Sequence, residues 1–149
     1  MTNLFTDEYF MKHALSQAKI AFDKEEVPVG AVIVYKNQII SSAHNLTETL
    51  NDPTAHAEMQ AITSASNLLG AKYLKECTLY VTVEPCVMCA GAGYWSQIGK
   101  IVYGTEDDKR GYSAFHDQII HPRTQIKSGV LKQECSALIT DFFYKIRNA

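Results

Sequence analysis

The sequence predicts an α/β domain in which helices cover both faces of a central sheet. Stretches with apolar residues at three- and four-residue spacing, typical of helices, alternate with short runs rich in β-branched and aromatic residues, typical of strands. The last stretch, from Leu131 onward, again has helical spacing. Alternation of this kind favours a layered architecture, because helices and strands that follow one another pack against each other.

The first predicted helix begins at Thr6, a good N-cap that is followed by two acids at the positive end of the helix dipole. Pro28 prevents the helix from continuing past the charged residues 24–26. Two β-rich runs follow, at 30–35 and 38–42, and the two residues between them predict a hairpin. The apolar stripe of the helix consists of Phe10, Ala14, Ala18, Ala21 and Phe22.

Residues 43–51 have the composition of a loop. The next helix is predicted from Asp52, with Pro53 at its first helical position, to about Leu69, and Gly70 stops it. The elements that follow are a buried strand at 78–83, a helix from near Cys86 to about Ser96, and a strand at 100–104.

The pattern from 105 to 122 is weak and predicts a loop with one helical piece. Residues 124–127 form a last short strand that ends in a turn at Ser128-Gly129. The long amphipathic helix from Leu131 completes the chain.

The size of the chain predicts one domain, 1–149, with one hydrophobic core. Apolar residues make up 46% and charged residues 20%, as in an ordinary globular protein. Four cysteines are too few for a disulfide scaffold, and no signal peptide or apolar run of about 18 residues is visible. We therefore expect a cytoplasmic protein with reduced thiols, free to bind metal, and no membrane partner.

Charge is distributed unevenly along the chain. Residues 1–108 carry seven Lys/Arg against thirteen Asp/Glu, a net of −6, whereas residues 109–149 carry seven against three, a net of +4. A basic C-terminal third on an acidic protein suits a nucleic-acid backbone, although ordinary solvated helix faces give the same pattern.

Two short segments carry the chemistry: His56-Ala57-Glu58 and Pro85-Cys86-Val87-Met88-Cys89. The cysteines are three residues apart at a predicted helix start, so both sulfurs lie on one face, and the helix dipole favours the thiolate that zinc binds. One imidazole and two thiolates make three ligands. Three ligands plus water form an open catalytic zinc site, whereas structural sites close with a fourth.

The positions of His56 and Glu58 set a geometric condition. Residues two apart on a helix point about 200° away from each other, so both side chains reach one site only if His56 lies in the turn that enters the helix. Pro53, three residues upstream, is compatible with such a turn.

The arrangement H-x-E…P-C-x-x-C is the known signature of zinc nucleobase deaminases. Nearly the whole chain resembles the bacterial tRNA-specific adenosine deaminases, of the zinc-dependent cytidine and deoxycytidylate deaminase superfamily. The matching stretches are 26–34 (EVPVGAVIV), 52–58 (DPTAHAE), 78–92 (TLYVTVEPCVMCAGA), 107–111 (DDKRG) and 129–143 (GVLKQECSALITDFF).

The resemblance implies a three-layer α/β/α fold of the cytidine deaminase type with a central five-stranded mixed sheet. It implies a homodimer that binds Zn²⁺ and deaminates adenosine to inosine at the wobble position of a tRNA anticodon, with the anticodon stem-loop as partner. It implies that His56, Cys86 and Cys89 hold the metal. Asn45, Asp107 and Lys109 match family positions that lie beside the substrate.

Glu58 is the predicted catalytic residue, because it is not a ligand and lies two residues from one. It would take a proton from zinc-activated water, pass it to a ring nitrogen, and then protonate the departing ammonia.

Two other functions remain open from the sequence. Tyr94-Trp95 resembles the free guanine deaminases of the superfamily, so deamination of a free base or nucleoside such as guanine or cytosine is the alternative. A non-enzymatic zinc module that binds RNA is the third possibility. It would need a fourth ligand, for which Cys77, Cys135 and His121 are candidates without a supporting spacing.

Overall fold

The computed structural model describes residues 3–149. The expectation that the chain begins without a signal peptide also concerns residues 1 and 2, which lie outside the described residues. It contains a five-stranded sheet with the strand order β2-β1-β3-β4-β5. Strand β1 pairs antiparallel with β2 and β3, whereas β3, β4 and β5 run parallel, so the sheet is mixed as predicted. The strands are β1 (Gly30–Tyr35), β2 (Gln38–His44), β3 (Cys77–Val83), β4 (Lys100–Thr105) and β5 (Gln125–Ser128).

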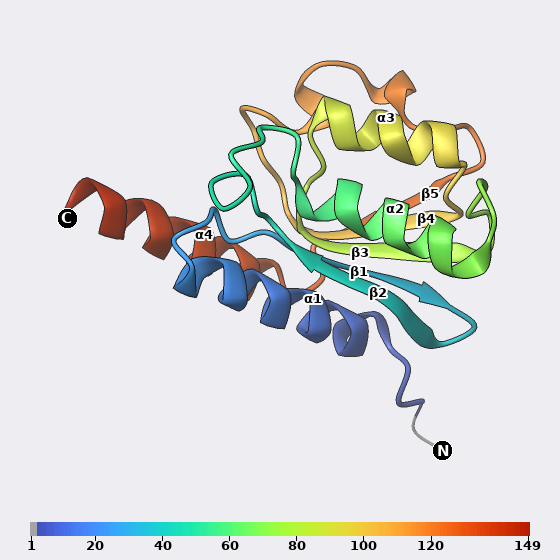
Figure 1. The fold of residues 1–149 in the computed structure, drawn as a ribbon, viewed down its shortest axis with the longest axis horizontal. Helices are drawn as coiled ribbons and strands as arrows, with labels where there is room; N and C mark the ends of the chain where they lie inside the picture. The colour runs from blue at the N-terminus through green and yellow to red at the C-terminus, as the bar shows by residue number, and fades with distance from the viewer. Residues whose placement is uncertain (1–2) are drawn as a thin grey trace.

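Four helices form the outer layers of the molecule. Figure 1 shows α2 and α3 on one face of the sheet and α1 and α4 on the other, which is the predicted three-layer α/β/α arrangement. The helices are α1 (Asp7–Asp23), α2 (Ala57–Leu69), α3 (Val87–Ser96) and α4 (Lys132–Arg147). No helix within residues 3–149 is long and apolar enough to cross a membrane.

The sheet has a hydrophobic core on each face, because successive strand residues point to opposite sides. On β1, Ala31 and Ile33 pack toward α2 and α3, while Val32 and Val34 pack toward α1 and α4. Helix α1 lies directly on β1: a Cβ at Gly30 would stand 2.0 Å from the carbonyl oxygen of Ala14, so only glycine fits there.

Most predicted elements are confirmed, with small differences in their bounds. Thr6 caps α1 by accepting a hydrogen bond from Tyr9 N, and Gly70 ends α2 at a φ of 61°. The second strand continues to His44, two residues into the predicted loop. The segment 105–122 contains two 3-10 turns, Tyr112–Ala114 and Asp117–Ile119, where one helical piece was expected.

The predicted start of the second helix at Asp52 was wrong. The Asp52 carboxylate accepts hydrogen bonds from the amide and hydroxyl of Thr54, both at 2.8 Å, and so folds residues 52–54 into a tight turn. Pro53 belongs to this turn, and the helix begins only at Ala57, with His56 as its N-cap.

Candidate metal centre and active site

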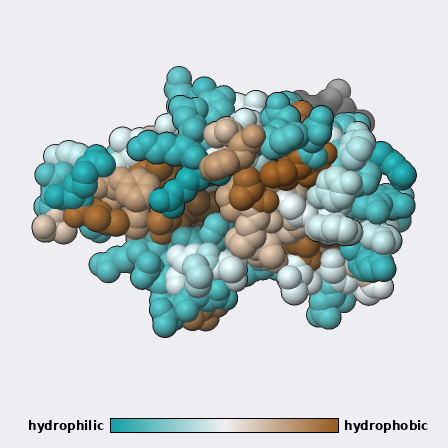
Figure 2. Space-filling model, turned by 90° about the horizontal axis from the view of Figure 1, so that it is seen from above, coloured by the Kyte–Doolittle hydropathy of each residue, from teal (hydrophilic) through white to brown (hydrophobic). Residues whose placement is uncertain are grey.

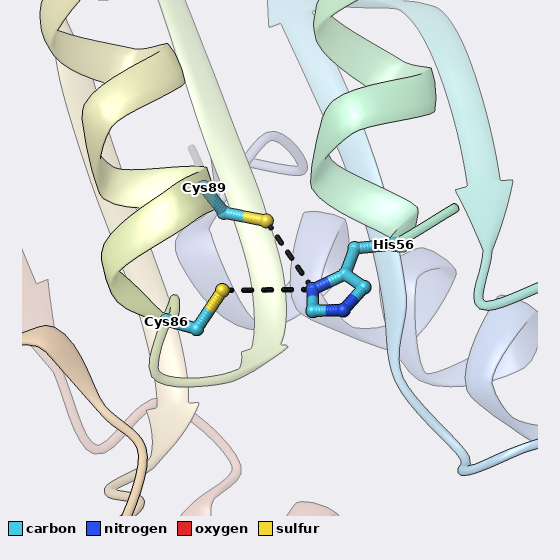
Figure 3. Close-up of side chains that lie close together, drawn as sticks. All are labelled: His56, Cys86 and Cys89. Carbon is cyan, nitrogen blue, oxygen red and sulfur yellow. Dashed lines mark hydrogen bonds between the residues drawn. The ribbon is translucent and has the colours of Figure 1, made fainter. Parts of the chain in front are cut away.

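The metal centre lies where the N-terminal ends of α2 and α3 meet. Helix α2 leads into β3, and α3 follows β3, so both helices place their first turns at the edge of the sheet where β3 ends. His56 is the N-cap of α2 and Cys86 the N-cap of α3. Figure 3 shows the three side chains of His56, Cys86 and Cys89 pointing toward one another across the gap between the two helices.

His56 lies in the turn that enters α2, as a shared site with Glu58 requires. Its backbone is extended, with φ −73° and ψ 152°, so the direction of the imidazole is not set by the helix that follows. Glu58 lies inside the first turn of α2 and is buried. Both side chains line the same cavity as a result.

The distances between the three donor atoms fit zinc. His56 Nδ1 lies 3.6 Å from Cys86 Sγ and 3.5 Å from Cys89 Sγ. Zinc bonds of about 2.3 Å to sulfur and about 2.0–2.1 Å to nitrogen, at a tetrahedral angle, place those atoms about 3.6 Å apart. Zn²⁺ is therefore the cofactor that this donor set fits.

The described residues offer no fourth protein ligand to this group of three. Cys77 belongs to the core cluster under α2 and α3, and Cys135 to the cluster on the opposite face. His121 lies against the ring of Tyr94, with centroids 5.1 Å apart. Three ligands leave one tetrahedral position free, which is the open arrangement of a catalytic zinc site.

Cys86 has the properties of a metal-binding thiolate. Its hydrogen bonds with Cys89 and then with His56 outweigh the opposing effect of burial and lower its pKa to about 4. Burial acts in the other direction on Glu58 and raises the pKa of its carboxyl group to about 7. An acid with a pKa near neutrality exchanges protons readily in both directions.

A cavity of about 480 Å³ opens beside the metal centre. Its walls come from the segment before β1, the start of α2, the end of β3 with the residues that follow it, and two loops, one after β2 and one after β4. The residues that line it include Val27, Val29, Asn45, Thr47, Glu48, Asn51, Asp52, Pro53, His56, Ala57, Glu58, Val83, Glu84, Cys86, Asp107 and Arg110. A volume of this size accommodates one nucleobase or nucleoside.

Two of the three predicted substrate residues line this cavity. Asn45 is buried, donates to Val27 O and accepts from Thr47 N, each at 3.3 Å, which leaves one N–H and one lone pair of its amide for a ligand. Asp107 accepts hydrogen bonds from the amides of Lys109 and Arg110. Lys109 itself is exposed and is not among the lining residues, whereas its neighbour Arg110 is.

Two buried acids that sequence reasoning missed hold the loops around the cavity. Glu26 is fully buried and accepts hydrogen bonds from the amides of Glu48 and Thr49, while Glu84 accepts from the amides of Asp107 and Ser113. The signal that could have found them is an acid within an apolar run: Glu26 precedes Val-Pro-Val, and Glu84 stands between Val83 and Pro85. A carboxylate in such a place is buried, and a buried carboxylate needs hydrogen-bond donors.

A family model described as the cytidine and deoxycytidylate deaminase zinc-binding region matches residues 5–105. The tRNA-specific adenosine deaminase of Aquifex aeolicus (strain VF5) is 47% identical over 146 residues, which cover 95% of this chain and 96% of that protein. The tRNA-specific adenosine deaminase of Bacillus subtilis (strain 168) is 44% identical over 146 residues, which cover 95% of this chain and 91% of that protein.

Solved structures give the same fold. A structure from a study of A-to-I editing by tRNA deaminases at the wobble position of transfer RNA superposes with a TM-score of 0.81 at 37% identity, over 87% of this chain and 98% of that one. A guanine deaminase from Bacillus subtilis superposes with a TM-score of 0.65 at 43% identity, over 68% of this chain and 65% of that one.

Proposed function

This chain belongs to the cytidine and deoxycytidylate deaminase family, and from that premise we propose that it converts adenosine to inosine at the wobble position of a tRNA anticodon. The observation that carries the proposal is the group of His56, Cys86 and Cys89 at zinc-binding distances, with the buried Glu58 on the wall of the same cavity. The relatives with high coverage that act on tRNA favour adenosine in RNA as the substrate.

The reaction adds the oxygen of water to C6 of the purine and releases the 6-amino group as ammonia. His56, Cys86 and Cys89 would hold a zinc ion, which would act as a Lewis acid and make water a nucleophile near neutral pH. Glu58 accepts a proton from that water and delivers it to a ring nitrogen as the C–O bond forms. Glu58 then takes the remaining proton from the oxygen bound to C6 and passes it to the amino group, which leaves as ammonia when the C–N bond breaks.

Side chains of the cavity wall orient the nucleotide. The free amide N–H and lone pair of Asn45 suit the polar edge of a purine or its ribose. Asp107 has one carboxylate oxygen engaged by its own loop and presents the other to a ribose hydroxyl. Lys109, on the exposed side of the same loop, suits a phosphate of the RNA backbone.

We also propose that the protein is a single-domain homodimer that works in the cytoplasm. A face of α3 supports the dimer, because Val87 is 41% and Trp95 79% exposed there, and a tryptophan so exposed is unusual away from an interface. Figure 2 shows apolar residues gathered in the middle of the side on which α3 lies. Trp95→Glu should reduce the dimer to a monomer in analytical ultracentrifugation.

A second candidate is deamination of free guanine. It is favoured by the 43% identity to a guanine deaminase over 68% of the chain and by the Tyr94-Trp95 pair on α3. The deciding experiment compares an anticodon stem-loop RNA with free guanine, cytosine and adenosine as substrates of the zinc-loaded protein. Inosine in the RNA is the expected product, and turnover of a free base without activity on the RNA would overturn the tRNA proposal.

A further inference from the structure

The loop that follows β4 is fixed to the segment that carries Cys86. Glu84 is only 4% exposed, and its carboxylate accepts hydrogen bonds from Asp107 N at 3.2 Å, Ser113 N at 3.0 Å and Ser113 Oγ at 2.6 Å. One buried acid therefore binds both ends of the loop. A buried carboxylate held by several donors gives a rigid connection, since breaking it would leave the charge without partners.

Backbone contacts make the same connection. Tyr112 N donates to Pro85 O at 2.9 Å, and Gly111 forms an isolated β-bridge with Cys86. A Cβ at residue 111 would stand 2.3 Å from the carboxyl carbon of Glu84. Glycine is thus required for the loop to approach this closely, and the loop has a fixed position relative to the metal ligands.

Arg110 belongs to this anchored loop and directly precedes Gly111. Its amide donates to Asp107 Oδ1 at 3.0 Å, and the residue is exposed and is among those that line the cavity. Arg110 is the one lysine or arginine among the described lining residues, which also include the acids Glu48 and Asp52.

The guanidinium of Arg110 is free to bind an anion. The ion pairs found within residues 3–149 join Lys127 to Asp7 and Lys132 to Glu106, and neither involves Arg110. An anionic strand that binds at a cavity lined by acids is stabilised by a cation among the lining residues, and a guanidinium binds phosphate oxygens in a bidentate manner.

We propose that Arg110 binds a backbone phosphate next to the reacting nucleotide, and that Glu84 is the positioning residue that holds its loop in place. The inference rests on the proposed function, because a free base carries no phosphate. Arg110 thus selects a polynucleotide over a free base at the cavity itself, whereas the basic residues of α4 do not line the cavity.

The test measures kcat and KM for stem-loop RNA over a salt series with Arg110→Ala, Arg110→Lys and the control Lys72→Ala. Lys72 is an equally exposed cation at the end of α2 and β3 opposite to the site. Arg110→Ala should raise KM about tenfold, the effect of one charge-assisted hydrogen bond, with kcat within about twofold. It should also reduce the slope of log affinity for RNA against log salt concentration by about 0.7, the value for one phosphate contact on a single strand.

Arg110→Lys should keep that slope and lose part of the affinity, because the charge remains and the bidentate geometry does not. Lys72→Ala should match the parent. An unchanged KM and slope in Arg110→Ala, with the parent active on RNA, would overturn this inference alone. A parent without activity on the RNA would overturn the proposed function and this inference with it.

A second variant tests the anchor without replacing Glu84, because a Cβ at residue 111 would collide with its carboxylate. Gly111→Ala should displace the loop and raise KM for RNA while zinc content stays at one per chain. If the loop acts through Arg110, the double variant with Arg110→Ala should be no worse than the more severe single variant. Additive losses in the double variant would refute the positioning role.

Discussion

At the scale of single residues, Glu58 combines burial with a place beside the proposed metal ligands. The residue is 4% exposed, and burial raises the pKa of its carboxyl group to about 7. A buried carboxyl group with a pKa near neutrality, on the wall of a cavity beside the metal-binding group, has the properties of a general acid–base residue.

We expect Glu58→Gln to keep the fold and one zinc per chain but to lose deamination. The amide has the same shape and cannot take up a proton, so the loss should be at least about 10²–10⁴-fold, the contribution typical of general acid–base catalysis. Single-turnover assays with metal analysis provide the measurement, and Glu76→Gln, at an exposed site far from the cavity, is the control. Activity within tenfold of the parent would exclude the proposed role.

The two cysteines should be necessary for metal binding. Cys86→Ala or Cys89→Ala removes one of three ligands, so we expect loss of zinc and of all activity, measured by elemental analysis and assay. Cys77→Ala is the control, since Cys77 is a thiol as buried as Cys89 that packs in the core cluster and is not part of the metal-binding group. Full zinc occupancy after substitution of Cys86 or Cys89 would contradict the ligand assignment.

At the scale of elements, the start of α1 is tied to the sheet by one carboxylate. Asp7 accepts a hydrogen bond from Tyr80 of β3 at 2.8 Å and forms an ion pair with Lys127 of β5 at 2.6 Å. Burial of Asp7 raises its pKa, but the hydrogen bonds from Lys127 and Tyr80 outweigh that effect and leave the pKa below its usual value.

The contacts of Asp7 with Tyr80 and Lys127 should make part of the free energy of unfolding depend on pH. The pKa of Asp7 is lower in the folded state than in the unfolded state. The carboxylate therefore stabilises the fold fully at pH values above its unfolded-state pKa, and this stabilisation is lost as the pH falls through its folded-state pKa. Asp7→Asn should cost about 1 kcal/mol at pH 7, after allowance for solvent screening, and progressively less below about pH 4. Urea unfolding across pH measures this, with Glu8→Gln on the exposed face as control; a constant difference at all pH values would contradict it.

At the scale of the whole molecule, the basic C-terminal third lies on elements that reach outward. Helix α4 projects past the sheet on the side to which the N-terminal ends of α2 and α3 point (Figure 1). Its last turn carries Lys145 and Arg147, both exposed. A bound RNA stem would therefore meet cations at some distance from the reacting base.

Lys145→Ala with Arg147→Ala should weaken binding of stem-loop RNA and flatten its salt dependence. For every phosphate that the variant no longer neutralises, the slope of log affinity against log salt concentration should fall by about 0.7 to 0.9, the values for single strands and for a duplex. Zinc content and turnover at saturating RNA should barely change, since neither side chain lines the cavity. RNA binding with the parent's affinity and salt slope would show that the stem is held elsewhere.

Much of this organisation was determined by the sequence. Periodicity, caps and turn residues are local properties, so they predicted most helices and strands to within a few residues, including the Thr6 cap and the Gly70 stop, whereas the start of α2 was predicted too early. The spacing of Cys86 and Cys89 likewise predicts a shared face, because the helix alone sets their relation. These signals need no information from distant parts of the chain.

Tertiary structure decided what depends on contacts between distant segments. The turn at residues 52–54 is itself local and competes with the helix start that Asp52-Pro53 suggests, but the packing of the extended His56 opposite α3, toward which its imidazole points, is tertiary. Glu84 and Arg110 are 26 residues apart, and only packing brings the loop of one onto the carboxylate of the other. Local sequence patterns do not predict contacts between segments that are far apart in the chain. The candidate zinc ligands, which lie in short motifs, were therefore evident from the sequence, whereas the residues that form the walls of the cavity were not.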